Sequence, residues 1–144
     1  SMFPTLNNKD TLLVWMLGYT PKQGDIVVID LTDNKEVNNE VVVKRVIAIA
    51  GQTVRIDYKG NTVYVDEKPL REHYINAADS DCMLSGLFGD EELTNVIVPE
   101  GCIFVLGDNR RVSKDSRSFG SISEENIIGK ARMVFYPLWR IRLI

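Results

Sequence analysis

The sequence predicts an all-β fold, in which an antiparallel, barrel-like sheet forms the core and carries a smaller β-rich insertion. The apolar runs are short, rich in β-branched residues and bounded by glycine and proline, which favours strands over helices. A helix signal appears at residues 121–124, where a serine and a glutamate resemble a capping box for one or two turns. With 144 residues, 44% hydrophobic and 26% charged, the chain suits one globular domain with a real core.

The expected strands follow one another along the chain. The second is a long β-branched run that carries Lys44 and Arg45 in its interior. The third and fourth flank a Lys-Gly-Asn turn, which predicts a hairpin. The expected ranges are 25–29, 41–50, 54–56, 63–65, 102–106 and 131–136.

The composition changes between Ile75 and Thr94, where acidic residues, glycines and serines indicate a surface excursion. We therefore expect a core made of residues 1–53 and 100–144, which would hold any catalytic centre. Residues 54–99 would form an inserted β-rich subdomain.

Composition and motifs exclude several classes of function. A net charge of −3 and a pI near 5.2 argue against binding nucleic acid through bulk electrostatics. No apolar run approaches the roughly 18 residues of a membrane span, and no signal-peptide pattern opens the chain. Phosphate-loop and dinucleotide motifs are absent. The chain has one histidine and two cysteines, and the cysteines lack the close spacing of zinc ligands. We expect neither metal nor cofactor.

The two cysteines, Cys82 and Cys102, allow one disulfide. Cys82 lies in the polar excursion and Cys102 opens a strand, so the sequence does not constrain their distance. Two free thiols, with Cys102 buried, is the simpler expectation.

The densest polar cluster is residues 107–120, which follow the apolar run 102–106. Two glycines enclose two aspartates, several arginines and several hydroxyls. Opposite charges packed so closely at a strand end indicate a buried hydrogen-bonded network. The alternative is an ordinary Gly-Asp-Asn turn braced by Arg–Asp pairs.

Lys44 is unusual because it lies within a β-branched run. With a period of two it shares a face with Val42 and Val46, both apolar. Burial favours the neutral amine, and a pKa lowered by about two units would make neutral lysine roughly 100-fold more abundant at pH 7. Such a lysine is a candidate general base. The alternative is a side chain that reaches solvent from a sheet edge.

Ser1 is the candidate nucleophile, because it stands just before a proline-fixed turn at Pro4. A Ser-His-Asp triad would need His73, which adjoins a glutamate in a polar segment typical of a surface. A Ser/Lys pair is what remains. A terminal serine also raises the possibility that its own α-amine is the base.

Three segments together resemble the bacterial type I signal peptidases, membrane-bound Ser/Lys endopeptidases. Residues 1–6 resemble the family's Ser-Met-x-Pro-Thr-Leu box, and residues 44–47 resemble its Lys-Arg-Val-Ile box. Residues 107–120 match its Gly-Asp-Asn-Arg box at every fixed position, although residues 48–52 depart from the loop that many members have after the lysine.

The resemblance implies roles for individual residues. Ser1 and Lys44 would be nucleophile and general base, and Ser113 would hold the lysine nitrogen in line. Four charged residues would brace the loop without acting as acid or base. These are Asp108, Arg110, Asp115 and Arg117.

The family also implies an extended substrate, bound by strand addition. Val41 and Val43 would offer backbone hydrogen bonds, and Met2 with Val43 would line a shallow pocket for small side chains. The expected partners are preproteins with signal peptides and the membrane surface, with the catalytic domain on the extracytoplasmic face of the cell membrane.

The family's membrane anchor, and the strand that leads into the nucleophile, would precede Ser1. We therefore expect this chain to be a trimmed portion that is weakly active or inactive by itself. Two alternatives are a self-cleaving Ser/Lys repressor and a non-catalytic, signal-peptidase-like assembly chaperone. Residues 134–144 interleave apolar side chains with arginines, which either close the core or rest on a membrane with Arg140 and Arg142 at the headgroups.

Overall fold

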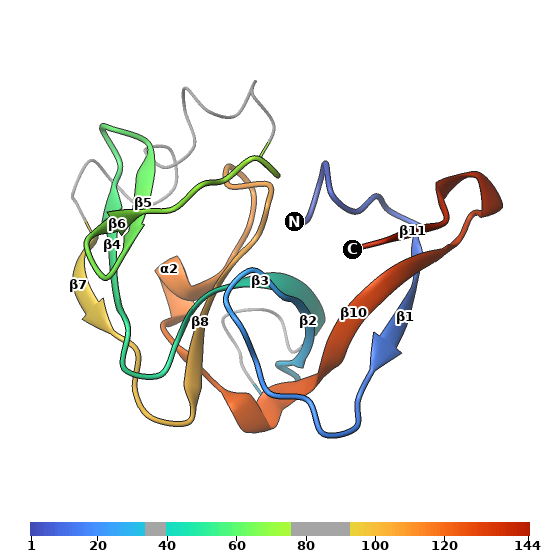
Figure 1. Ribbon diagram of the computed structural model, residues 1–144, viewed down its shortest axis with the longest axis horizontal. Helices are drawn as coiled ribbons and strands as arrows, with labels where there is room; N and C mark the ends of the chain where they lie inside the picture. Colours follow the sequence, from blue (N-terminus) through green and yellow to red (C-terminus); the bar gives the residue numbers. More distant parts are fainter. Residues whose placement is uncertain (34–39, 76–92) are drawn as a thin grey trace.

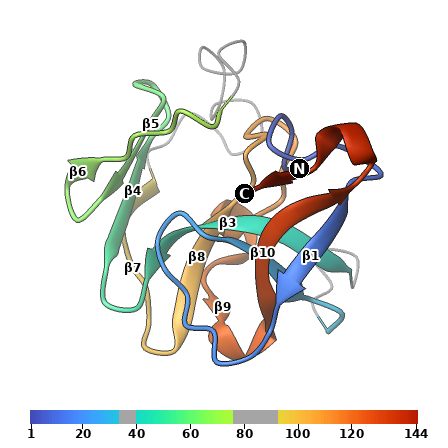
Figure 2. The same ribbon diagram turned by 45° about the vertical axis from the view of Figure 1, so that its right-hand side comes forward.

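The computed structural model describes residues 1–33, 40–75 and 93–144, and it confirms the all-β prediction (Figures 1 and 2). The strands are β1 (Thr11–Trp15), β2 (Ile26–Asp30), β3 (Val41–Ile49), β4 (Thr53–Asp57), β5 (Thr62–Val65), β6 (Lys68–Pro69), β7 (Leu93–Ile97), β8 (Cys102–Leu106), β9 (Ile122–Ser123), β10 (Ile127–Tyr136) and β11 (Arg142–Leu143). The short helical segments are α2 (Ser116–Phe119) and the 3-10 turns η3 (Glu124–Asn126) and η4 (Leu138–Arg140).

The larger sheet has the strand order β1-β10-β2-β3-β8-β9, and β11 pairs with β10 beside this path. Every pairing in it is antiparallel. β3 lies in its middle, where β2 pairs with residues 41–45 and β8 pairs with residues 45–49. At Arg45, next to Lys44, β3 is therefore hydrogen-bonded to strands on both of its edges.

The smaller sheet has the order β6-β5-β4-β7 and lies to the left of the larger sheet in Figures 1 and 2. The predicted hairpin is present as β4 and β5, with Val54 opposite Val65 and Ile56 opposite Val63. All strands of this sheet come from residues 53–97. The division of the chain into a core and an inserted subdomain stays a prediction.

One hydrophobic cluster joins the two sheets. Apolar side chains of β3 and β8 pack with those of the β4–β5 hairpin. Between the sheets, Gly51 turns the chain with a φ of 81°, a conformation that a β-carbon disfavours. The shared core fixes the smaller sheet against the strands that lead into the site.

Local structure departs from the sequence prediction at several points, and five strands, β1, β6, β7, β9 and β11, were not predicted. The predicted helix at residues 121–124 is a short strand followed by η3, and its cap is Ser123, whose hydroxyl accepts from the Glu125 amide. The helix that does form, α2, is one turn long and too short to leave a periodic pattern. Cys102 is a free thiol but only half-buried, because it opens β8, and Cys82 lies outside the described residues.

The end of the chain partly follows the membrane interpretation. Trp139 is 83% exposed and Leu143 82%, so these side chains do not close the core. The arginines, however, turn inward: Arg140 pairs with Asp10 at 3.0 Å, and Arg142 donates to the Thr5 carbonyl. Both guanidinium groups thus have protein acceptors, and the expectation that Arg140 and Arg142 lie at lipid headgroups stays a prediction.

Candidate active site

The site forms where the middle of β3 meets the loop that follows β8. Arg45 lies opposite Leu106, the last residue of β8, so the loop that begins at Gly107 starts beside Lys44. The N-terminal segment reaches the same place, because the Asn109 amide donates to the Ser1 carbonyl at 2.8 Å. Three segments far apart in sequence thus converge.

Lys44 is buried, with 3% of its surface exposed. Its Nζ donates a hydrogen bond to Ser113 Oγ at 3.0 Å. Burial lowers the pKa of Lys44 from an ordinary 10.5 to about 8, a shift that Asp115 opposes and Arg117 assists. The alternative of a lysine that reaches solvent is excluded.

Gly107 is the point of closest approach in the site. A β-carbon there would overlap Ser113 Oγ and lie 2.7 Å from the Ser1 carbonyl oxygen. Any side chain would separate the serine that holds Lys44 from the N-terminal segment. A glycine is therefore required by space, not by a positive φ.

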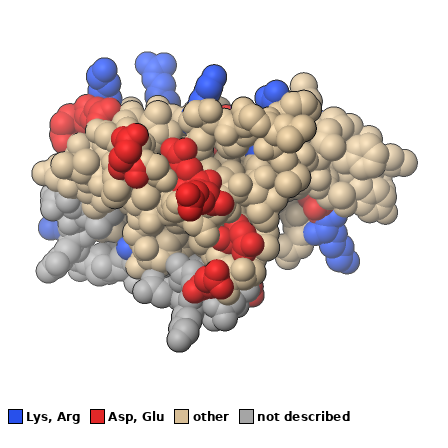
Figure 3. Space-filling model, turned by 90° about the horizontal axis from the view of Figure 1, so that it is seen from below, with Lys and Arg blue, Asp and Glu red and all other residues tan. Residues whose placement is uncertain are grey.

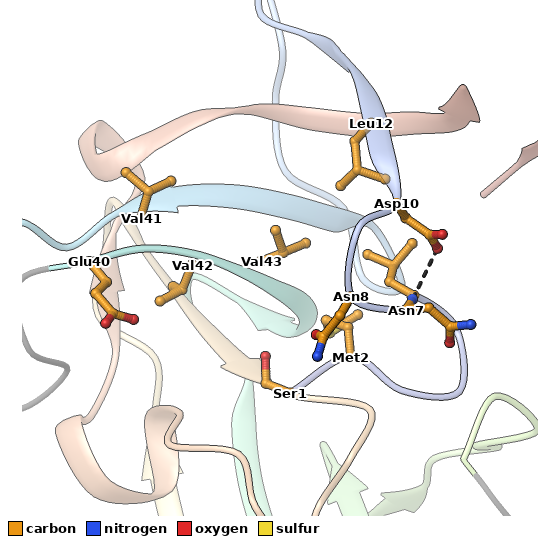
Figure 4. A pocket seen from close by; sticks show the side chains of 11 residues that line it. Ser1, Met2, Asn7, Asn8, Asp10, Leu12, Glu40, Val41, Val42 and Val43 are labelled. Atoms are coloured by element: carbon orange, nitrogen blue, oxygen red, sulfur yellow. Dashed lines mark hydrogen bonds between the residues drawn. The ribbon is translucent and has the colours of Figure 1, made fainter. Parts of the chain in front are cut away.

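Ser1 lies at the mouth of this site. Its side chain is exposed, and Figure 4 shows it pointing toward the strand that carries Val42 and Val43. Within the described residues, the hydrogen bond of Lys44 Nζ goes to Ser113, and none joins it to the Ser1 hydroxyl.

Asp115 and Arg117 form a buried pair that shapes the loop. Arg117 Nε and Nη2 donate to the two oxygens of Asp115 at 2.7 and 2.8 Å. Asp115 also accepts from the Gly107 amide at 3.0 Å and caps α2, while Arg117 Nη2 donates to the Ser113 carbonyl at 3.3 Å. The pair thus holds the backbone of both Gly107 and Ser113.

Asp108 and Arg110 connect the loop to other parts of the chain, although Arg110 Nε also donates to the Gly107 carbonyl within the loop at 3.0 Å. Asp108 accepts a bidentate pair from Arg45, with Nε at 2.8 Å and Nη2 at 2.7 Å, and also a hydrogen bond from the Thr5 hydroxyl. Arg110 donates to the Glu72 carboxylate.

Sequence reasoning missed Arg45, Glu72 and Tyr74. Arg45 carried a signal, since a second cation in the interior of a strand needs an anionic partner. Glu72 and Tyr74 carried none, because nothing local links them to a loop almost forty positions later. His73, the rejected triad candidate, is exposed, with its ring 5.7 Å from that of Tyr74.

A groove of about 270 Å³ runs from Ser1 along β3 (Figure 4). Its lining residues come from the N-terminal segment, β1 and the start of β3. They are Ser1, Met2, Leu6, Asn7, Asn8, Asp10, Leu12, Glu40, Val41, Val42 and Val43. The three residues predicted to bind substrate, Met2, Val41 and Val43, thus line one groove beside the predicted nucleophile.

The backbone of β3 is open along this groove. β8 meets β3 only from Arg45 onward, so in the described part of the chain residues 41–43 have no strand partner on the edge away from β2. An unpaired edge offers hydrogen-bonding groups to an added strand. Over residues 1–33, 40–75 and 93–144, no group of three His, Cys, Asp or Glu side chains is placed to hold a metal ion.

Comparison with known proteins identifies the family. Residues 1–136 match the family described as "Signal peptidase, peptidase S26". The chain belongs to this family. Signal peptidase IB of Staphylococcus aureus is 36% identical over 148 residues, which cover 95% of this chain and 74% of the relative. A probable signal peptidase I-1 of Synechocystis is 37% identical over 147 residues, covering 97% of this chain and 69% of the relative.

A solved structure agrees. The crystal structure of a signal peptidase I from Enterococcus faecalis aligns with a TM-score of 0.59 and 31% identity, covering 78% of this chain and 97% of that one. Signal peptidases of family S26 are serine endopeptidases that cleave signal peptides, and the chain has this activity by membership. Neither the repressor nor the chaperone alternative gains support.

Signal peptidases I are anchored in the membrane, with an extracytoplasmic catalytic domain that acts on preproteins. In the segments that the structure describes, no helix is long and apolar enough to cross a membrane.

Proposed function

We propose that Ser1 and Lys44 are the catalytic residues with which this signal peptidase cleaves its substrates. The observation that carries the proposal is the buried Lys44 amine, hydrogen-bonded to Ser113 Oγ at 3.0 Å. A lysine in this setting is a base whose pKa lies near the pH at which it works. Ser1 is the hydroxyl-bearing residue that meets both this site and the substrate groove.

In the first step, neutral Lys44 takes the hydroxyl proton of Ser1 while Ser1 Oγ bonds to the carbonyl carbon of the scissile peptide. The resulting ammonium gives that proton to the amide nitrogen as the C–N bond breaks, which leaves an ester on Ser1. Water then attacks the ester with Lys44 again as base, and the returning proton regenerates the Ser1 hydroxyl.

The lowered pKa decides whether Lys44 can do this. At pH 7, a lysine with a pKa of about 8 is neutral in about 10% of molecules, roughly 300 times more than at the ordinary value of 10.5. Ser113 is a positioning residue, since its oxygen fixes the direction of Nζ.

The four charged residues of the loop are support, not acids or bases. Asp115 and Arg117 hold the backbone at Gly107 and Ser113, and Asp108 and Arg110 tie the loop to Arg45 and Glu72. Every one of them already has a charged partner, so none is free to exchange protons with substrate.

The substrate lies in the groove as an added strand. Its backbone pairs with the open edge of β3 at Val41 and Val43, and its side chain before the scissile bond enters the space between Met2 and Val43. Met2 is 4% exposed and packs in the same hydrophobic cluster as Val43, so the side chain that enters there meets an apolar wall.

The preprotein meets the enzyme at the membrane surface. β1, the end of β10 and η4 lie at one end of the molecule, on the right in Figure 1, and expose large apolar side chains. On the face seen in Figure 3, the right-hand end is mostly uncharged, with charged side chains along its lower edge. The exposed residues there include Leu13, Trp15, Phe135, Leu138, Trp139, Ile141 and Leu143. A patch of this kind suits contact with lipid, and its attraction is mainly apolar because Arg140 and Arg142 are already paired.

Cleavage of a signal-peptide substrate by the full-length enzyme tests the catalytic pair. Ser1→Ala and Lys44→Ala each abolish cleavage while circular dichroism stays that of the wild type. Lys44→Arg is also inactive, because a guanidinium does not deprotonate. Cleavage by folded Lys44→Arg would assign the base to another group, with the Ser1 α-amine as the second candidate if Ser1 is a terminus in the active protein.

A further inference from the structure

Residues 70–75, here called the bridging segment, connect the smaller sheet to the loop at Gly107. They follow β6 and run toward the connection between β8 and α2 (Figures 1 and 2). Their start is fixed, because the Leu70 amide donates to the Val63 carbonyl at 2.8 Å and the Leu70 side chain packs on the shared core. Two side chains then reach the active-site loop.

The first contact is made by Glu72. Its carboxylate accepts from both terminal nitrogens of Arg110, one of them at 3.2 Å. Arg110 is 1% exposed, and its Nε donates to the Gly107 carbonyl at 3.0 Å. Glu72 is therefore connected through Arg110 to Gly107, the glycine that packs against Ser113.

The second contact is made by Tyr74. Its ring lies over the guanidinium of Arg45, with Cζ 3.9 Å from the ring centroid. Arg45 follows Lys44 in β3 and holds Asp108 in a bidentate pair. The Tyr74 hydroxyl donates to Glu72 at 3.0 Å, so the two contacts are joined.

The Glu72 contact compensates a charge that is costly to bury. Burial alone lowers the pKa of Arg110, and the Glu72 carboxylate reverses this and raises it, so the guanidinium stays charged. Without Glu72, a buried cation would have lost its partner, and the loop would have to move to bring Arg110 to water.

We propose that Glu72 and Tyr74 are positioning residues for catalysis, through which the smaller sheet holds the Gly107 loop so that Ser113 stays on Lys44. The proposal rests on the proposed roles of Lys44 and Ser113. It gives the smaller sheet a part in the reaction, although none of its strands lines the substrate groove.

Replacing Glu72 or Tyr74 is expected to change the pKa of Lys44 by changing the packing around its amine. The charged groups that face Lys44 are Asp115 and Arg117, both from the loop. When the loop relaxes, water gains access to Nζ, and the pKa of Lys44 rises toward its ordinary value. A rise of about one unit lowers the neutral fraction at pH 7 about tenfold.

The chain contains a matched control for this test. Arg55 contacts Glu67 at 3.4 Å, and its Cζ lies 3.8 Å from the Tyr64 ring centroid, so the same three residue types meet on the smaller sheet. Glu67 is exposed, and the contacts that the structure gives for this trio lie on the smaller sheet, away from the Gly107 loop. Glu67→Gln and Tyr64→Leu are therefore compared with Glu72→Gln and Tyr74→Leu.

Kinetics of the full-length enzyme in detergent, over a range of pH, provide the measurement. Glu72→Gln and Tyr74→Leu each lower kcat at pH 7 about tenfold, leave KM within about twofold, and move the acid limb of kcat upward by about one pH unit. Tyr74→Phe keeps the ring over Arg45 and recovers most of the activity. The two control variants behave as the wild type.

Two results overturn the proposal. One is an unchanged kcat and acid limb in both Glu72→Gln and Tyr74→Leu. The other is a lowered Tm with the acid limb unmoved, which marks a purely structural contact. If Glu72→Gln fails to fold, the Tyr74 variants decide alone. An active Lys44→Ala enzyme refutes the proposed function itself, a failure distinct from these two.

Discussion

Lys44 Nζ and Ser113 Oγ lie 3.0 Å apart, joined by a buried hydrogen bond between residues 69 positions apart in sequence. The contact joins an amine on the central strand β3 to a hydroxyl on the loop after β8, and both residues are almost without exposure. A neutral lysine with a fixed direction needs both conditions, burial for its protonation state and a partner for its orientation.

Removing the Ser113 hydroxyl tests the orientation. Ser113→Ala leaves Lys44 buried but undirected, so kcat falls about 100-fold, a magnitude typical of a misplaced general base, while KM changes little. Ser123→Ala, which removes only the cap of η3, serves as the control and keeps full activity. Equal kcat values for the two variants would show that Ser113 has no part in catalysis.

Space at Gly107 gives a second prediction. Gly107→Ala forces a β-carbon against Ser113 and the Ser1 carbonyl, so cleavage is lost even where the protein remains folded. Gly101→Ala is the control, because Gly101 has a φ of 69° but open space around it. That control costs about 1 kcal/mol of stability from backbone strain and leaves kcat intact. Activity in Gly107→Ala would contradict the described approach of the three segments.

The buried lysine also makes stability depend on pH. The pKa of Lys44 is about 8 in the folded state and 10.5 in the ordinary, unfolded state, so between these values the unfolded chain binds more protons. The free energy of unfolding therefore rises with pH across this window, by about 3 kcal/mol. Lys44→Met lacks this rise and is more stable than the wild type at pH 7.

Urea unfolding at several pH values measures this change in the free energy of unfolding. The difference between wild type and Lys44→Met isolates Lys44, because Tyr19 and Tyr74, whose pKa values are raised by burial and by neighbouring carboxylates, titrate in both proteins. A constant difference from pH 7 to pH 10.5 would mean that Lys44 keeps its ordinary pKa.

The exposed apolar patch predicts binding to lipid. This chain co-sediments with neutral phosphatidylcholine vesicles, whereas the Trp139→Ser/Leu143→Ser variant stays in solution. The variant lacks the two large apolar side chains whose transfer from water to lipid favours binding. Because the attraction is mainly apolar, salt has little effect. A variant at Ile97, which is also exposed but lies on the smaller sheet, is the control. Equal binding by all three proteins would contradict a role for this patch.

Much of the site follows from local sequence. The β-branched run around Lys44 predicts a buried strand, and a buried strand predicts a buried lysine, as the structure finds. The cluster after Leu106 predicts a polar network, because dense opposite charges need partners. What the sequence does not contain is the choice of partner. From the sequence, Asp108 and Arg110 could pair with each other. In the folded chain Asp108 pairs with Arg45, and Arg110 pairs with Glu72.

Strand β1 and helix α2 were not predicted, and the reason also lies in the tertiary structure. β1 exposes every second residue, but Leu13 and Trp15 lie on its outer face, so the strand lacks the usual polar alternation. The single turn of α2 is stabilised by the Asp115 cap and by its buried pair with Arg117, which arise only after the loop has folded.

The pKa of Lys44 in the folded chain tests the central claim most directly. A titration followed by NMR, with lysine labelled at Cε and the signal assigned by its loss in Lys44→Met, reports this value without any substrate. We predict a midpoint of about 8, more than two units below the ordinary lysine value of 10.5. A midpoint near 10.5, in a protein that remains folded, would contradict the account, because Lys44 would then be a cation throughout the range in which the enzyme works.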